Sequence, residues 1–228
     1  MVSGLHLSRF SSSEKDCNHP GLLLADEAVA AAAIDAGISG AYSYPGTPAT
    51  EILEFSQAHA SPNRSISAPW SANDKVAFEE ALGVSYSGRR AFVSMKHVGL
   101  NVAADPFINS AITGANGALV LAVADDPGMH SSQNEQDSRF FADFAQLPLF
   151  GPSNQQEAYD MTREAFDLSE RLGLPAVVRL VTRLAPRRMT LPQQTQTTPP
   201  TCRETRHGAW KIPTRAQTQW AQGFTSKP

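Results

Sequence analysis

Apolar residues follow two different spacings in the middle of the chain, between residues 21 and 185. Segments in which they recur every three to four residues predict amphipathic helices, and short apolar runs rich in β-branched residues predict buried strands. The predicted helices are 26–36, 49–59, 71–87, 100–113 and 155–172. The predicted strands are 38–43, 65–68, 90–95, 117–124, 148–150 and 176–180.

The alternation of these strands and helices favours parallel βαβ units with right-handed crossovers. We therefore expect an α/β fold: a doubly wound, mostly parallel sheet of about six strands with helices on both faces. Capping signals mark the starts of three helices. The capping pairs are Thr47 with Pro48, Ser71 with Asp74, and Ser153 with Gln156.

Polar loops follow three of the predicted strands, at 44–48, 96–101 and 125–139. In an open α/β sheet, ligands bind at the carboxyl edge of the strands, where such loops converge. The longest loop contains carboxylates, amides, hydroxyls and a histidine. Lys96 and His97 add a cation and a group that titrates near neutral pH, although a single histidine is more often structural. We therefore expect a binding site at this edge.

Composition narrows the class of protein. The 228 residues, 41% hydrophobic and 18% charged, fit one globular domain with an additional tail. A net charge of -3 provides no basic field for nucleic acid. Cys17 and Cys202 are too few and too far apart for a disulfide framework, a cysteine zinc site or a self-contained iron–sulfur cluster. Carboxylates interrupt the apolar stretch at 22–36, so we expect no membrane span.

The two ends of the chain differ from its middle. Residues 1–20 are polar and aperiodic, which predicts a flexible N-terminal segment without a signal peptide. Residues 186–228 are rich in Pro, Thr, Gln and Arg, which predicts a disordered tail. We therefore expect one folded domain, residues 21–185, in a cytoplasmic protein.

Four segments carry a further signal when they are taken together. They read YPGTP at 44–48, WSANDKVA at 70–77, MKHVGLNVAADP at 95–106 and DDPGMHSSQNEQDSR at 125–139. In this order they resemble the N-terminal domain of the alpha subunit of indolepyruvate:ferredoxin oxidoreductases, a branch of the 2-oxoacid:ferredoxin oxidoreductases. The resemblance covers about 21–183.

The resemblance implies a thiamine diphosphate enzyme. Members of this family decarboxylate a 2-oxoacid, pass electrons through iron–sulfur clusters to ferredoxin and form an acyl-CoA, and this branch acts on arylpyruvates such as indolepyruvate. The chain corresponds to the pyrimidine-binding domain, whereas a diphosphate-binding domain supplies a metal-ligating GDG motif. No GDG occurs here. The resemblance therefore assigns Mg²⁺ and the iron–sulfur clusters to missing domains or partners in a homo- or hetero-oligomer, and predicts no activity for the chain alone.

The resemblance also implies roles for individual residues. Asp74 matches a family glutamate whose carboxylate is hydrogen-bonded to N1′ of thiamine. This hydrogen bond promotes the pyrimidine tautomer in which the 4′-amino group can take the C2 proton of the thiazolium. Aspartate is one methylene shorter, which retracts the carboxylate by more than ~1 Å. The implied catalytic residues are Asp74, His97 and Thr47. The implied cofactor contacts are Pro45, Gly46, Thr47, Asp74, Lys96 and His97, and the implied substrate contacts are His130, Ser131 and Arg139, with no metal ligand in this chain.

Two other functions stay open. A metal-dependent hydrolase could use carboxylates and imidazoles at the strand edge as ligands. The candidate ligands are His97, Asp105, Asp125, Asp126 and His130. A noncatalytic, vestigial interaction protein is the second alternative, because Asp74 departs from the family pattern and the GDG motif is missing.

Overall fold

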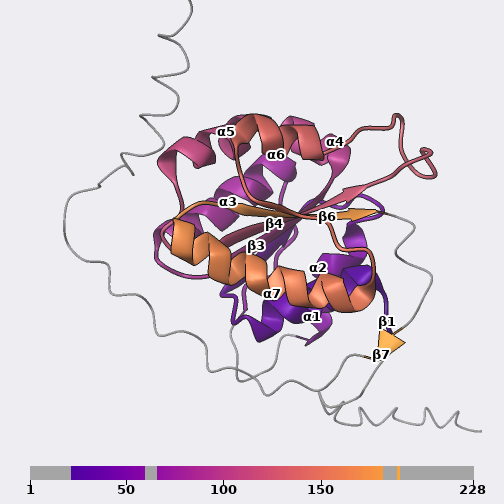
Figure 1. Ribbon diagram of the computed structural model, residues 1–228, viewed down its shortest axis with the longest axis horizontal. Helices are drawn as coiled ribbons and strands as arrows, with labels where there is room; N and C mark the ends of the chain where they lie inside the picture. The colour runs from indigo at the N-terminus through magenta and orange to yellow at the C-terminus, as the bar shows by residue number, and fades with distance from the viewer. Residues whose placement is uncertain (1–21, 60–65, 182–188, 191–228) are drawn as a thin grey trace, which may run out of the picture.

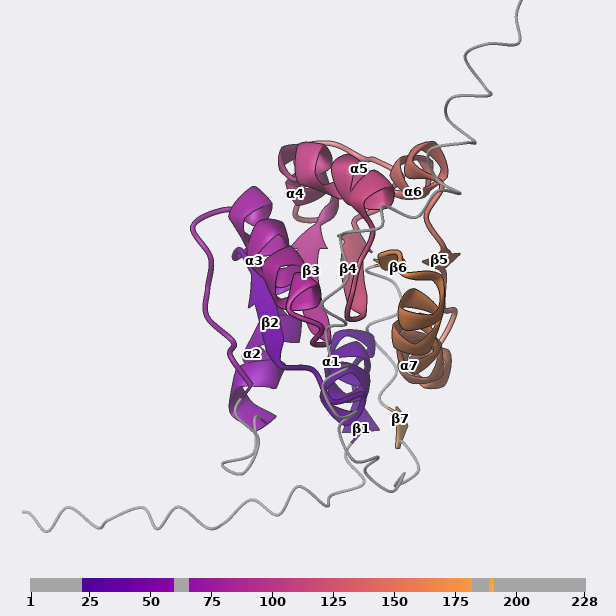
Figure 2. The same ribbon diagram turned by 90° about the vertical axis from the view of Figure 1, so that its left-hand side faces the viewer.

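A parallel sheet of five strands runs through the middle of the protein. The computed structural model describes residues 22–59, 66–181 and 189–190. The strand order is β2-β3-β4-β6-β5, and Figure 2 shows the first four side by side. The strands are β2 (Gly40–Ser43), β3 (Ala91–Lys96), β4 (Leu119–Asp125), β5 (Leu149–Phe150) and β6 (Ala176–Val181).

Helices cover both faces of this sheet (Figure 1). On one face lie α1 (Ala25–Asp35), α2 (Thr50–His59) and α7 (Gln155–Leu172). On the other face lie α3 (Asp74–Tyr86), α4 (His97–Val102), α5 (Ala104–Thr113) and α6 (Arg139–Ala145). The predicted α/β, doubly wound fold is therefore confirmed.

The central strand β4 corresponds to the apolar run from which a buried strand was predicted. All seven of its residues are buried, as expected for a parallel strand covered on both faces. Its side chains alternate between two cores: Val120 packs with α1 and α7, and Leu121 packs with α3 and α5. No described helix is both long and apolar enough to cross a bilayer.

One predicted strand, 65–68, is reduced to an extended edge segment. Ser67 and Trp70 form isolated bridges to Gly40 and Ser43, so the segment runs parallel to β2 without becoming a regular strand. Pro69 has no N–H to donate, which restricts it to a sheet edge. The first residue of that prediction, position 65, lies outside the described residues.

The predicted helix 100–113 is wrong in its outline. The structure has two helices there, with α4 beginning at His97 and α5 at Ala104. Pro106 explains the break, because it has no N–H to give to the carbonyl of Val102 in a continuous helix. Helix α6 was not predicted, since its exposed Phe140 and Phe144 hide the usual polar face.

The predicted N-caps are also displaced. Helix α3 is capped by Asn73, whose side chain accepts the N–H of Val76 at 2.9 Å, rather than by Ser71. Helix α7 is capped by Asn154 rather than Ser153. Thr47 does not cap α2, which begins three residues later. Asn caps as well as Ser, so spacing alone could not choose between neighbouring candidates.

Two short strands form a separate two-stranded sheet. β1 (Leu22–Leu23) pairs antiparallel with β7 (Met189–Thr190), and β7 falls within the predicted tail. The N-terminal segment 1–20, the rest of the tail and both cysteines lie outside the described residues.

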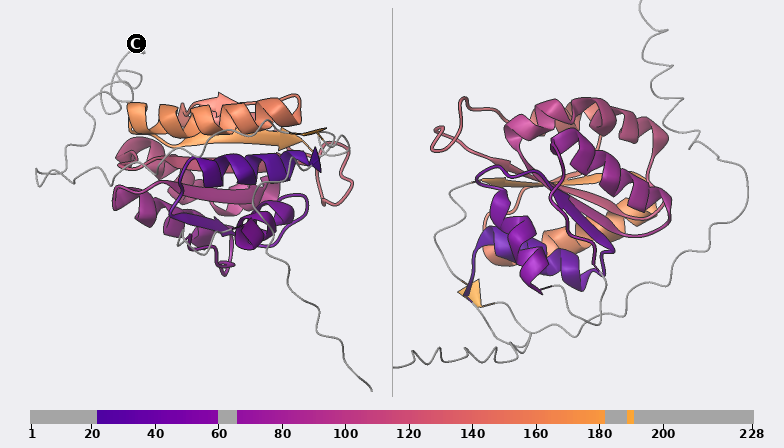
Figure 3. Two further views of the ribbon diagram at one scale, coloured as in Figure 1. Left: turned by 90° about the horizontal axis from the view of Figure 1, so that it is seen from below. Right: turned by 180° about the vertical axis from the view of Figure 1, so that it is seen from behind.

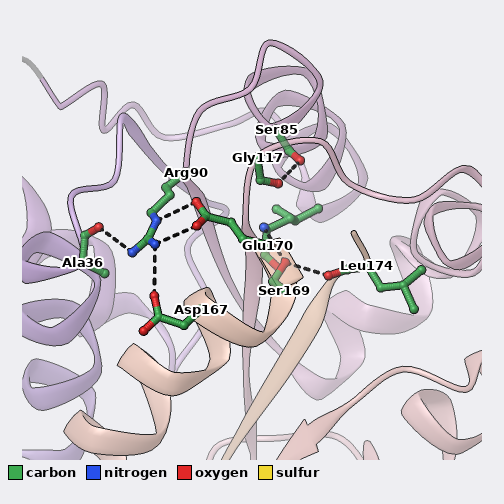
Figure 4. A network of polar contacts seen from close by, with 9 residues as sticks. Ala36, Ser85, Arg90, Gly117, Asp167, Ser169, Glu170 and Leu174 are labelled. Carbon is green, nitrogen blue, oxygen red and sulfur yellow. Dashed lines mark hydrogen bonds and ion pairs between the residues drawn. The ribbon is translucent and has the colours of Figure 1, made fainter. Parts of the chain in front are cut away.

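A polar network ties the amino edge of the sheet to two helices (Figure 4). Arg90, directly before β3, donates through Nε to Glu170 at 2.8 Å and through Nη2 to Asp167 at 3.0 Å, both on α7. Its Nη1 donates to the carbonyl of Ala36 at the end of α1 at 3.0 Å. Ser169 of α7 accepts the N–H of Leu119 at the start of β4. This edge is opposite the polar loops and holds the scaffold together.

Replacing Arg90 with alanine should lower the free energy of unfolding by roughly 2–3 kcal/mol, because Glu170 would keep its partly buried carboxylate without a cation. Urea unfolding measures the change. Arg89→Ala is the control: this neighbour is exposed, so its change should stay within about 0.5 kcal/mol. Equal losses in the two variants would contradict the role given to Arg90.

Candidate functional site

The polar loops meet at the carboxyl edge of the sheet, as the sequence predicted. Lys96, the last residue of β3, donates through Nζ to the carbonyl of Ser131 at 2.7 Å. Ser131 in turn donates through Oγ to the carbonyl of Thr47 at 3.4 Å. The loops after β2, β3 and β4 are thereby joined. The loop between β4 and α6 projects beyond the sheet edge (Figure 1, Figure 3).

Asp126 organises this projecting loop from within. Its carboxylate is fully buried and accepts four hydrogen bonds, from the N–H groups of His130 and Ser131 and the hydroxyls of Ser131 and Ser132. Burial alone would raise the pKa of Asp126, but these hydrogen bonds outweigh it and lower the pKa to about 2. Asp126 is therefore an ionised anchor for the loop.

Asp125 anchors the end of the same loop. It is also fully buried, and its Oδ2 accepts from Arg179 Nε on β6 at 2.6 Å and from the N–H of Ser138 at 3.1 Å. Arg179 lies 3.6 Å from Asp137, which pairs with Arg139. A chain of alternating charges thus fixes the turn from the loop into α6.

His97 is buried rather than open to a ligand. Only 1% of it is exposed, and its Nε2 lies 3.1 Å from the carbonyl of Asn134 in the projecting loop. A carbonyl can only accept, so Nε2 carries the proton in this contact. The other ring nitrogen, Nδ1, is buried with no partner among the described residues. His97 thus holds the loop and keeps one hydrogen-bonding position unused.

Asp74 is the first residue of α3 and lies at the same edge. It is 8% exposed, and no side chain in the described part of the protein donates to its carboxylate. Burial raises its pKa to about 6, against a smaller opposing effect of its own backbone N–H. The carboxylate lies directly against Gly99 of α4. Asp74 therefore differs from Asp125 and Asp126, whose charges are compensated.

The remaining predicted site residues are mostly exposed. Pro45, Thr47 and His130 lie open on the two loops. Gly46 lies beside the stem of Lys96. Arg139 is exposed and already bonded to Asp137, which lowers the pKa of that carboxyl to about 2. A substrate carboxylate at Arg139 would have to compete with Asp137.

The candidate metal ligands do not form a cluster. Within 22–59, 66–181 and 189–190, no group of three or more His, Cys, Asp or Glu side chains is placed to hold a metal ion. Asp105 pairs with Lys75 at 3.1 Å, and Asp125 and Asp126 at the end of β4 accept the hydrogen bonds described above. The geometry therefore gives no support to the metal-dependent hydrolase.

Three residues of the site were not predicted: Gly99, Asn134 and Arg179. Arg179 offered a usable signal, because a charged side chain inside the apolar run AVVRLV must find a buried partner. Gly99 and Asn134 lie within the quoted motifs, but nothing in their spacing indicates which side chains they meet.

The fold and the site together define a ligand-binding α/β domain with a buried, uncompensated carboxyl group at the carboxyl edge of its sheet. The chain belongs to the family described as pyruvate flavodoxin/ferredoxin oxidoreductase, thiamine diphosphate-binding, whose model matches residues 31–212. The resemblance predicted from the motifs is thereby confirmed.

Individual relatives agree with this assignment. Indolepyruvate oxidoreductase subunit IorA of Archaeoglobus fulgidus is 51% identical over 166 residues, which cover 72% of this chain and 27% of the relative. The IorA subunit of Pyrococcus abyssi is 48% identical over 162 residues, covering 71% and 25%. The chain thus spans about a quarter of the length of these curated relatives.

A solved structure shows the same fold. The 2-oxoglutarate:ferredoxin oxidoreductase from Magnetococcus marinus, with 2-oxoglutarate, coenzyme A and succinyl-CoA bound, matches with a TM-score of 0.67 and 20% identity. The match covers 76% of this chain and 31% of that one.

Asp74→Asn should stabilise the protein at pH 7 but not at pH 4. The folded-state pKa is raised to about 6 from an ordinary 3.8, so the ionised carboxylate opposes folding above pH 6 and both states are protonated below pH 4. The wild type should therefore lose stability relative to the variant as pH rises from 4 to 6, by about 2–3 kcal/mol.

Urea unfolding at several pH values measures this difference. Asp143→Asn is the control, because Asp143 is exposed on α6 and the substitution removes a carboxylate that is not buried. If the difference in free energy of unfolding between Asp74→Asn and the wild type did not vary with pH, burial of the carboxyl group would not destabilise the protein.

Proposed function

We propose that this chain is the pyrimidine-binding part of a thiamine diphosphate-dependent 2-oxoacid:ferredoxin oxidoreductase that acts on indolepyruvate or related arylpyruvates. The observation that carries the proposal is Asp74: a buried carboxyl group with a raised pKa, to which no side chain of the described residues donates, in the position that the family resemblance assigns to the thiamine-activating carboxylate. The similarity to IorA subunits supports the arylpyruvate class.

The residues present fit this cofactor. Thiamine diphosphate supplies, when bound, a thiazolium carbon that adds to the 2-oxoacid carbonyl and accepts the electrons released on decarboxylation. The carboxyl group of Asp74 would hold a proton against the pyrimidine ring nitrogen. A pKa of about 6 suits that task, because the group exchanges its proton near neutral pH. A ring nitrogen there would give the buried carboxyl group the partner it lacks.

The loops would form the remainder of this half of the site. Pro45, Gly46 and Thr47 belong to the loop after β2, which we propose contacts the cofactor. Lys96 and His97 hold the projecting loop, which carries the proposed substrate contacts. Nδ1 of His97 is buried without a partner among the described residues, so it would be available for a hydrogen bond to a ligand.

The substrate contacts stand on the projecting loop and at its end. We propose His130, Ser131 and Arg139 for the 2-oxoacid, whose carboxylate needs a cation or a hydrogen-bond donor. Arg139 would have to give up its hydrogen bonds to Asp137 in order to bind the substrate carboxylate.

The other half of the site would come from another domain or subunit. The printed sequence contains no GDG motif, so we propose that a diphosphate-binding partner supplies the Mg²⁺ ligands and the diphosphate contacts. The iron–sulfur clusters would also lie on that partner, since two cysteines cannot hold one. The relatives, which are about four times as long as the matched segment, support this arrangement.

Thiamine diphosphate with Mg²⁺ should bind to a mixture of this chain and a GDG-containing partner, as measured by calorimetry. Asp74→Ala should weaken that binding at least tenfold, whereas Asp143→Ala should not. Asp74→Glu should restore the reach of the carboxylate and raise the 2-oxoacid oxidation rate of the mixture, by up to about a hundredfold. Absence of binding in the mixture and in the isolated chain would instead favour the noncatalytic interaction protein.

The purified chain alone should not oxidise indolepyruvate, because it contains neither a GDG motif nor cysteines enough for a cluster. Reduction of ferredoxin or a viologen dye is the measurement, with the same assay of the partner mixture as positive control. Sustained turnover by the isolated chain would show that the site is complete without a partner.

A further inference from the structure

Gly99 leaves open a space that the Asp74 carboxylate fills. A Cβ built on Gly99 would lie 2.3 Å from Asp74 Oδ1, 2.5 Å from Cγ and 2.9 Å from Oδ2. Real Cβ atoms essentially never approach other heavy atoms this closely. Any side chain at position 99 would therefore have to displace the carboxylate or the helix.

Gly83, the other glycine in the described helices, has no such contact. Gly83 lies on α3 with no atom within 4 Å of its added Cβ, so it accommodates a side chain freely. Glycine is a poor helix former compared with alanine. Glycine at position 99 therefore lowers the intrinsic stability of α4. The space that it leaves is filled by the carboxylate of Asp74.

The Asp74 backbone cannot easily shift to relieve a clash. Asn73 caps α3 by accepting the N–H of Val76, and Ala77 and Phe78 in the next turn are fully buried. With the backbone held, only the two side-chain torsions remain to relieve a clash, and changing them would move the carboxylate away from Gly99. Gly99 therefore controls where the carboxylate lies.

We propose that Gly99 is a positioning residue for Asp74: its missing side chain forms a seat that holds the carboxylate at the carboxyl edge of the sheet. The use of this seat for thiamine diphosphate rests on the proposed function. The seat itself is a property of the free chain and can be tested without cofactor.

The first test is the titration of Asp74 followed by carbon NMR of its carboxyl group. In Gly99→Ala the carboxylate should move into solvent, and its pKa should fall from about 6 toward the ordinary value of 3.8. Gly83→Ala is the matched control and should leave the titration unchanged. An unchanged titration in Gly99→Ala would overturn the proposal.

The second test is a double-mutant cycle measured by thermal unfolding. In the D74A background no carboxylate fills the seat, so Gly99→Ala should raise Tm as Gly83→Ala does. In the wild-type background it should raise Tm less or lower it. The same shift in both backgrounds would overturn the proposal. If Gly99→Ala does not fold, folding of D74A/G99A supports the seat, and failure of both overturns it.

The cofactor is tested separately. Gly99→Ala should weaken thiamine diphosphate binding to the partner mixture about tenfold, and Gly83→Ala should not. If the titration and the cycle succeed while the wild-type mixture binds no cofactor, the proposed function fails and the seat stands. If the wild type and Gly99→Ala bind equally well, the seat does not serve thiamine diphosphate.

Discussion

The burial of three carboxylates at one edge of the sheet is the constraint on which this site depends. A charge removed from water must be paired or hydrogen-bonded, or else the group takes up a proton. Asp125 meets this requirement through Arg179, and Asp126 through the projecting loop that it organises. No side chain in the described part of the protein donates to Asp74, and burial raises its pKa instead. Asp125 and Asp126 thus fix the projecting loop as ionised groups, whereas Asp74 takes up a proton more readily.

The scaffold followed from the sequence because its signals are local. The apolar run that became β4 and the regular stripe of α7 each identify an element from neighbouring residues alone. The errors arose where one residue decides between similar outcomes, as with Pro106 between α4 and α5. They also arose where exposed aromatics such as Phe140 conceal a helix.

The site was only partly predictable, because its contacts join residues far apart in the chain. The motifs identified the loops, and parallel topology placed them at one edge. They did not indicate that His97 would be buried under Asn134, or that Arg179 would neutralise Asp125. Such pairings depend on side-chain directions in the folded protein. A motif therefore indicates which residues gather, and the structure indicates which of them remain available.

Asp74 differs from Asp125 and Asp126 because no other side chain of the described residues donates to its carboxylate. A purely structural protein would gain stability by replacing a buried carboxyl group that has no donor, since such groups oppose folding when ionised. Here the carboxyl group is present, and the helix beside it carries a glycine, which has a lower intrinsic helix propensity than alanine. The buried carboxyl group and the glycine beside it are explained together if a ligand supplies a hydrogen-bonding partner for the carboxyl group. That requirement is met by a ligand at the sheet edge, and it would not be met by packing alone.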